Sequence, residues 1–177
     1  INDIGAHEDM LVTLLAAAGQ PNVKEELLKG KTVGDRTYKV HLDGYNLMPA
    51  LKGEAKWPRH EFVYWTDDGQ VAALRYNDWK ATFLRQDAHG IDVWRQPYTA
   101  LRAPMLTNLR MDPFERAEHE SIGYNRWWVD HMFMFAPAGA YIGQWLQSFR
   151  EFPPRQKPGS FNLDRVMEAI SKGAGDK

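Results

Sequence analysis

The sequence predicts an α+β protein in which a small antiparallel sheet of about four strands packs on helices. Three observations predict this class. Residues 61–86 hold three short apolar or aromatic runs separated by tight-turn signals. Segments with helical spacing of apolar residues precede them, and a longer apolar segment of the same kind follows at 124–149.

The N-terminal region predicts two helices. Residues 7–18 (HEDMLVTLLAAA) carry apolar residues at helical spacing, and Gly19 followed by Pro21 ends the segment. A second, shorter helix is expected from the Asn22 cap to Leu28, with its stop at Gly30.

The stretch between these helices and the sheet carries weaker signals. Residues 38–42 predict a short strand or extended segment that ends at Asp43-Gly44, and residues 47–51 predict one helical turn.

The sheet is the clearest prediction. Strands are expected at 61–66 (EFVYWT), 71–76 (VAALRY) and 79–86 (WKATFLRQ), joined by turns at Asp68-Gly69 and Asn77-Asp78. Residues 106–109 predict the fourth strand. The apolar alternation is imperfect, which indicates a meander with one face packed on helices.

The remaining segments connect and close the domain. Residues 87–105 predict a long loop anchored by Trp94, and such loops are functional or held down by a neighbour. The helix at 124–149 contains Pro137, which kinks it or splits it into two. A Pro-rich linker at 152–160 and a terminal helix at 163–170 complete the prediction.

Composition restricts the classes of function. The chain has 177 residues, a hydrophobic share of 44%, a net charge of −1 and no basic run, so it predicts one ordinary globular domain and gives no support for nucleic-acid or anionic-membrane binding. The absence of cysteine excludes disulfides, thiolate catalysis and Cys-ligated metals. The most apolar region, 127–141, is too short and too interrupted for a membrane span. Because the chain begins with Ile1, we expect a fragment or a processed piece.

Short polar clusters favour structural roles over chemistry. His7-Glu8-Asp9 lacks the second histidine of a zinc-protease helix, and acidic residues at a helix start complement the helix dipole. Asp67-Asp68-Gly69 lacks the alternating oxygen ligands of a calcium loop and fits a hairpin turn. Asp130-His131 predicts a packed, hydrogen-bonded pair, because no nucleophile or metal ligand accompanies it.

An aromatic and methionine stripe runs through the predicted long helix. Trp127 and Trp128 are neighbours about 100° apart on a helix, so they cannot share one face. One face is expected in the core, and the other is equally well explained as an interface with something outside this chain. The candidate interface residues are Trp94, Trp127, Trp128 and Phe133.

A series of short motifs carries a family resemblance. It begins with a D-x-x-x-T-L-L-x-x-A-G helix from Asp9 to Gly19 and DGYNLMPALKGE at 43–54. It continues with Pro58-Arg59, FVYW, ALRYNDWK at 73–80 and TNLRMDPFERAEH at 107–119. In this order and spacing the series resembles the C-terminal part of the sulfatase family, and closely that of bacterial arylsulfatases. Val12 departs from the family pattern, which has proline before the threonine.

The resemblance implies the fold and the organisation of the chain. It implies the C-terminal domain of the alkaline-phosphatase-like sulfatase fold, a four-stranded antiparallel sheet packed on a helix. Residues 1–36 would end the catalytic domain, 37–123 would form the sheet subdomain, and 124–177 would form a kinked helix, linker and terminal helix. Asp112-Pro113 would start a helix after the last strand, and Glu115 would cap it.

The resemblance also implies a reaction whose machinery this chain lacks. The family hydrolyses sulfate esters with a formylglycine nucleophile made within a C/S-x-P-x-R motif, beside a calcium ion. No residue here matches these parts, since the one spacing that ends in Arg155 has Glu151 in the nucleophile position. We therefore expect no catalytic or metal residue in this chain and no activity from it alone. The expected partners are the N-terminal catalytic domain of the same protein, a small sulfate-ester substrate for that parent, and a further copy in a homo-oligomer.

Two other classes remain as alternatives. The chain could be a free-standing binding or interaction module whose ligand surface is the aromatic helix and the loop at 87–105. An independent metallohydrolase using His7, His41, His119 or His131 is the third interpretation. The sequence leaves the substrate and the compartment, cytoplasmic or periplasmic, open.

Overall fold

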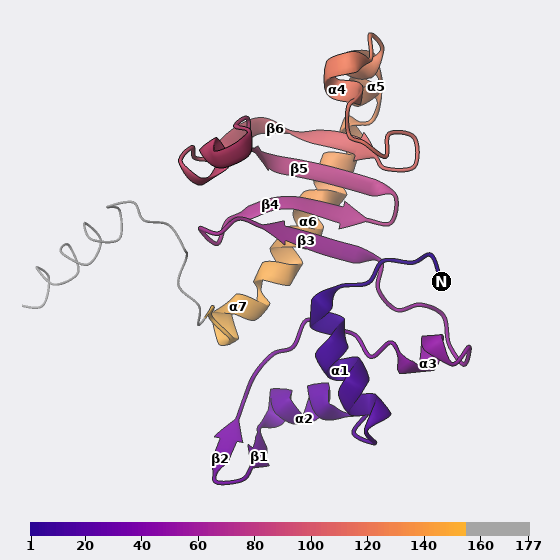
Figure 1. Ribbon diagram of the computed structural model, residues 1–177, viewed down its shortest axis with the longest axis vertical. Coiled ribbons are helices and arrows are strands. Elements are labelled where there is room, and N and C mark those ends of the chain that lie inside the picture. The colour runs from indigo at the N-terminus through magenta and orange to yellow at the C-terminus, as the bar shows by residue number, and fades with distance from the viewer. Residues whose placement is uncertain (155–177) are drawn as a thin grey trace, which may run out of the picture.

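The computed structural model describes residues 1–154 and shows two regions stacked along the long axis of the molecule (Figure 1). The N-terminal region contains α1 (His7–Ala17), α2 (Val23–Lys29), β1 (Lys31–Val33), β2 (Arg36–Tyr38) and α3 (Met48–Leu51). The expected terminal helix at 163–170 and most of the linker at 152–160 lie outside the described residues. Both expected N-terminal helices and the helical turn at 47–51 are present.

A small hairpin at 31–38 precedes the short strand or extended segment expected at 38–42, which contains no strand beyond Tyr38. β1 and β2 pair antiparallel with Val33 opposite Arg36, so Gly34-Asp35 forms a two-residue turn. Gly34 has a φ of 60°, a conformation that glycine adopts without a steric penalty. Glycine followed by aspartate is a hairpin signal. This pair lies next to residue 36, where the sequence analysis placed the boundary between the first two parts of the chain.

The main sheet confirms the predicted meander. β3 (Glu61–Trp65), β4 (Val71–Tyr76), β5 (Trp79–Arg85) and β6 (Thr99–Asn108) pair antiparallel in chain order. The β4–β5 turn places Asn77 at a φ of 50°, which asparagine tolerates better than most residues. The protein is therefore α+β with a four-stranded antiparallel sheet.

The fourth strand is longer than the expected 106–109. β6 starts at Thr99 and includes Pro104, which is compatible with its position as an edge strand of the sheet. The connecting loop contains η1 (Gly90–Trp94). The anchoring role expected of Trp94 is wrong for residues 1–154, since its side chain is 76% exposed.

The helix expected over 124–149 is divided. After α4 (Ala117–Glu120), the segment consists of α5 (Tyr124–Asp130), η2 (Met132–Met134), α6 (Phe135–Leu146) and α7 (Ser148–Glu151). Pro137 lies in the first turn of α6, where its missing N–H is no loss, and the break falls one turn earlier. A proline ring in a helix clashes with the carbonyl four residues before it, here Phe133, which explains the position of the break.

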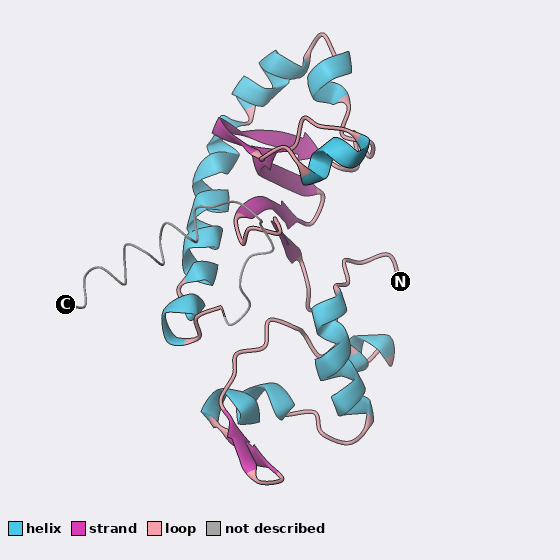
Figure 2. Ribbon diagram, turned by 60° about the vertical axis from the view of Figure 1, so that its left-hand side comes forward, coloured by secondary structure: helices cyan, strands magenta, loops and turns pink. Residues whose placement is uncertain are grey.

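α6 lies across one face of the main sheet (Figures 1 and 2). Ring contacts join it to the sheet: Tyr76 to Tyr141 at 5.9 Å, and Trp65 to Trp145 at 5.5 Å. Two separate apolar cores result. Val12, Val23 and Leu47 are buried in the N-terminal region, and Leu74, Ala81, Leu106 and Tyr124 are buried in the sheet region.

Candidate functional site

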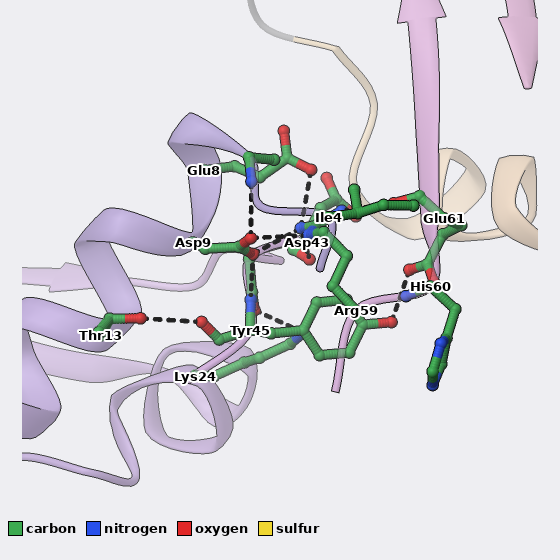
Figure 3. Close-up of polar contacts among 12 residues, drawn as sticks. Ile4, Glu8, Asp9, Thr13, Lys24, Asp43, Tyr45, Arg59, His60 and Glu61 are labelled. Carbon is green, nitrogen blue, oxygen red and sulfur yellow. Dashed lines mark hydrogen bonds and ion pairs between the residues drawn. The ribbon is translucent and has the colours of Figure 1, made fainter. Parts of the chain in front are cut away.

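A buried ion pair joins the N-terminal region to the sheet (Figure 3). Arg59 lies two residues before β3 and its side chain is 3% exposed. Its Nε donates to Asp9 Oδ2 at 2.7 Å and its Nη2 to Asp9 Oδ1 at 2.6 Å. This two-bond geometry is the one that a planar guanidinium makes best with a carboxylate.

Asp9 is positioned by the first turn of α1. It is fully buried, and besides Arg59 it accepts hydrogen bonds from the backbone N–H of Ala6 at 2.9 Å and of Tyr45 at 2.7 Å. The bond from Ala6 satisfies a free N–H at the helix start. One carboxylate therefore fixes the start of α1, the segment around Tyr45 and the entry to β3.

The segment Asp43–Tyr45 passes unusually close to α1. A Cβ on Gly44 would lie 2.1 Å from the carbonyl oxygen of Glu8, so only glycine fits without displacing the backbone. Thr13 holds the same segment, since its hydroxyl lies 3.2 Å from the Tyr45 carbonyl and accepts from Leu47 N–H at 3.0 Å.

A second carboxylate extends the network to the C-terminal helices. Tyr45 donates its hydroxyl to Glu61 Oε1 at 2.6 Å. Burial, followed by this bond to Glu61, raises the pKa of Tyr45 to about 12. Burial also raises the pKa of Tyr141, with the charge of Glu61 contributing in the same direction. Glu61 thus connects β3 to both Tyr45 and α6.

The charges of the central pair are stabilised by one another. Burial by itself raises the pKa of Asp9, but the hydrogen bonds from Arg59, Tyr45 and Ala6 outweigh it and hold that pKa below the usual 3.8. Burial lowers the pKa of Arg59, and its bonds to Asp9 more than reverse this. Both oxygens of Asp9 are occupied by donors, so the pair is suited to holding segments together, not to proton transfer.

A pocket of about 190 Å³ opens beside this pair. Glu8, Asp43 and Glu61 line it together with Arg59. Its other wall is apolar and mostly aromatic, formed by Val63, Trp65, Trp145 and Phe149. Among the residues described, this is where charged groups from α1, the connection at 43–59 and β3 meet aromatic rings of α6 and α7 around one hollow.

A second ion pair fixes the turn after β6. Lys80 Nζ donates to both Glu115 oxygens, at 2.9 and 2.8 Å, and lies 4.9 Å from the centre of the Tyr64 ring. The capping role expected of Glu115 is therefore wrong. Asp112 performs it, since its carboxylate accepts from the N–H groups of residues 116 and 117 at 3.0 and 2.8 Å.

The predicted interface residues are not brought together as one surface. Trp127 stacks on Trp79 with ring centres 5.8 Å apart, and Trp128 donates its Nε1–H to the Pro104 carbonyl at 2.9 Å. Both are half-buried against the sheet, whereas Phe133 is 67% exposed and Trp94 projects from η1. An interface role for these residues stays a prediction.

The pair expected from Asp130-His131 does not form. Asp130 bonds to Arg126 at 3.2 Å, and His131 Nδ1 lies 2.7 Å from the Trp127 carbonyl. His131 also stacks on the Trp127 ring, with centres 4.5 Å apart. His131 therefore packs between the end of α5 and the Trp79 ring.

The histidines of the metallohydrolase alternative lie on separate elements. His41 contacts Asp43, His119 contacts Glu118, and His131 lies in the aromatic stack. Within residues 1–154, no group of three or more His, Asp or Glu side chains is arranged to hold a metal ion. That part of the chain also contains no helix with the length and apolar character needed to cross a bilayer.

The sequence interpretation missed the Asp9–Arg59 pair. Asp9 was assigned to the helix dipole, and Arg59 carried no assigned role. The available signal was that both belong to the motifs that carry the resemblance. A scan of the chain against models of known protein families finds no match, and a search of curated protein sequences finds none either.

Proposed function

We propose that this chain is the C-terminal portion of an arylsulfatase-like sulfuric ester hydrolase. In this proposal the parent enzyme hydrolyses small sulfate esters with a formylglycine nucleophile and a calcium ion, both held by a catalytic domain that precedes Ile1. Residues 1–177 close one edge of that domain, shape the rim of its pocket and supply contacts between subunits.

The observation that carries the proposal is the meeting of the resemblance motifs in space. The first three, the helix motif, DGY and Pro-Arg, each contribute one residue to the central network: Asp9, Tyr45 and Arg59. The last two, ALRYNDWK and NLRMDPFE, contribute the partners Lys80 and Glu115. Five weak patterns that matched by chance would have no reason to supply each other's hydrogen-bond partners. Their pairing supports one inherited structural pattern.

The surface of α1 supports a missing neighbour. Met10, Leu11 and Leu14 are 48%, 52% and 60% exposed, on the side of α1 away from the buried Val12 and Thr13. Large apolar side chains grouped on one helix face indicate a contact surface. A helix that ends a catalytic domain and packs on it would cover this face.

The direct test is the coding sequence upstream of Ile1. We expect an open reading frame that continues upstream and contains a C/S-x-P-x-R motif. A gene that starts at this position, with no such motif before it, contradicts the proposal.

A second test uses the purified chain. We expect residues 1–177 to release no 4-nitrophenol from 4-nitrophenyl sulfate, with or without added calcium. Turnover that persists after any contaminating sulfatase has been inactivated would contradict the assignment of the chemistry to the preceding domain.

A free-standing binding module is the second candidate, favoured by the exposure of Trp94 and Phe133 in the loop and helices expected to form its ligand surface. Sedimentation and urea unfolding separate the two. A monomer that unfolds in one cooperative transition favours the module. Aggregation of the isolated chain favours the fragment, because the α1 face would be uncovered.

A further inference from the structure

β3 is an edge strand of the main sheet (Figure 1). The strand order is β3-β4-β5-β6, so within residues 1–154 no strand pairs with β3 on the side away from β4. An unpaired strand presents a row of N–H and C=O groups with which another extended chain can pair. The outer side of β3 is therefore a candidate surface for a polypeptide partner.

The hydrogen bonds at the two ends of β3 show which of its backbone groups point outward. Before the strand begins, the His60 carbonyl accepts from Asn77 N–H at 2.7 Å. After it ends, Thr66 N–H donates to the Gln70 carbonyl at 2.9 Å. Both bonds cross to the side of β4, so the even-numbered residues of β3 bond to β4. The odd-numbered residues then turn their N–H and C=O groups outward, because these groups alternate along a strand.

The outward residues are Glu61, Val63 and Trp65. Arg59 donates from this side to the Glu61 carbonyl at 3.2 Å, so the first position is occupied. Among the bonds made within residues 1–154, none reaches the backbone of Val63 or Trp65 from the outer side. An added antiparallel chain can exchange two hydrogen bonds with each of these residues.

The pocket beside Arg59 lies on this same edge. Glu61, Val63 and Trp65 all line it, so the side chains of the outward residues face the hollow. In an antiparallel pair, the residue opposite Val63 points its side chain to the same face as Val63. Glu61 and Trp65 become its diagonal neighbours, which long side chains can reach. One side chain of an added chain thus enters the pocket between a carboxylate and an aromatic ring.

The charge of the pocket selects that side chain. Three of the lining residues are carboxylates, Glu8, Asp43 and Glu61. The Arg59 guanidinium in the same wall already pairs with Asp9 at 2.6 Å and with Glu8 at 2.9 Å. An acidic side chain would therefore be repelled from the pocket, and a basic one would be attracted.

The aromatic wall suits a basic side chain as well. Trp65, Trp145 and Phe149 contact one another with ring centres 5.1 to 5.8 Å apart. Aromatic faces attract ammonium and guanidinium groups, and lysine and arginine stems bury against apolar surface. A second copy of this chain fits less well, since β3 contains no lysine or arginine and two paired β3 strands would bring two sets of the same carboxylates together.

We propose that the outer edge of β3 binds an extended segment of a partner polypeptide, antiparallel to β3, with a lysine or arginine opposite Val63. Backbone bonds to Val63 and Trp65 supply affinity for any extended chain, and the pocket supplies the preference for a basic residue. The site needs no catalytic domain before Ile1, so it is independent of the proposed function.

The test uses the full 177-residue chain and the probe peptide acetyl-TVTKTVT-amide, with binding measured by fluorescence anisotropy of the labelled probe. We expect replacement of the probe lysine with norleucine to weaken binding about five- to tenfold, because it removes a charge-assisted contact. Equal affinities of the lysine and norleucine peptides, or no binding of the lysine probe up to about 1 mM, overturn the proposal.

N-methylation of the probe tests the strand pairing without altering the protein. A methyl group on the lysine backbone nitrogen removes the N–H that donates to the Val63 carbonyl, and we expect at least about a tenfold loss of affinity. The matched control carries the methyl group on the next threonine, whose N–H points away from β3, and should lose less than about twofold. Equal losses overturn the proposal. So does binding of acetyl-lysine-amide as tight as that of the probe, because the pocket would then take a small cation alone.

A protein variant tests the carboxylates. Glu8→Gln with Asp43→Asn should weaken the lysine probe about tenfold and the norleucine peptide less than twofold. Glu25→Gln with Asp35→Asn, at two exposed positions of the N-terminal region, makes the same changes away from the pocket and serves as the control. Urea unfolding establishes that each variant is folded. Equal weakening by the two double variants, or equal weakening of the two peptides, overturns the proposal.

Discussion

Replacing Asp9 with asparagine tests the central ion pair while keeping the shape of the side chain. Asp9 accepts four hydrogen bonds, two of them from the Arg59 guanidinium, and neither side chain is accessible to solvent. An asparagine would place an NH₂ group against N–H donors and leave a buried guanidinium without its main counter-charge. Breaking a buried pair by removing one partner costs about 3–5 kcal/mol. For a chain of this size, that corresponds to a fall in Tm of about 6–20 °C.

The assay is urea unfolding followed by tryptophan fluorescence at pH 7, with Tm from calorimetry. Asp35→Asn is the matched control, because Asp35 lies exposed in the β1–β2 turn and its removal should change stability by less than about 0.5 kcal/mol. Joining Asp9→Leu to Arg59→Met should recover much of the loss, since the unpaired buried charge is then gone. A loss below about 1 kcal/mol for Asp9→Asn would refute the conclusion that this pair holds the two regions together.

Three further predictions follow from the same contacts. Gly44→Ala should lower the free energy of unfolding by about 1–3 kcal/mol or more, because the added Cβ meets the α1 backbone. Gly139→Ala, in the open face of α6, should raise it by about 0.5–1 kcal/mol. Urea midpoints that move in the same direction for both variants would contradict this. Tyr124→Phe should cost about 1–3 kcal/mol, because it leaves the buried Leu106 carbonyl without its 2.8 Å donor, and an unchanged midpoint would show that the bond is replaceable. Since the native pKa of Asp9 is below its usual 3.8, the stability from its ionisation should be complete above about pH 5, begin to fall near pH 3.8 and be lost as the pH falls through the lower native pKa. A pH series of unfolding free energies should show this acid limb, and it should flatten in Asp9→Asn. An identical limb in both proteins would assign the acid sensitivity to other groups.

The main sheet and the N-terminal helices could be predicted because their signals are local. Turn pairs such as Asp68-Gly69 and alternating aromatic runs fix a meander through contacts between neighbours in sequence. Pro137 likewise predicted a divided helix, and the break one turn earlier follows from the geometry of the proline ring. The hairpin at residues 31–38 was missed although Gly34-Asp35 carried a signal, because strands of three exposed residues show no apolar pattern.

The candidate site could not be predicted from spacing. Asp9 and Arg59 lie 50 residues apart, and a charged residue in a sequence looks the same whether it faces water or a buried partner. Glu115 shows the same difficulty on a smaller scale: its position favoured a helix cap, but the paired strands bring Lys80 beside it, and Asp112 caps the helix instead. An exposed apolar face such as that of Met10 and Leu14 also becomes visible only when the opposite face is seen to be covered.

The sequence by itself determined the first three strands of the main sheet with their turns, the two N-terminal helices, and that the class is α+β, since these depend on residues close together in the chain. Only the tertiary structure decided that Asp9, Tyr45, Arg59 and Glu61 meet, and that three carboxylates and an aromatic wall enclose one pocket. The physical reason is that charge pairing and burial act through space, and the distance between two side chains is set by the fold and not by their separation in sequence.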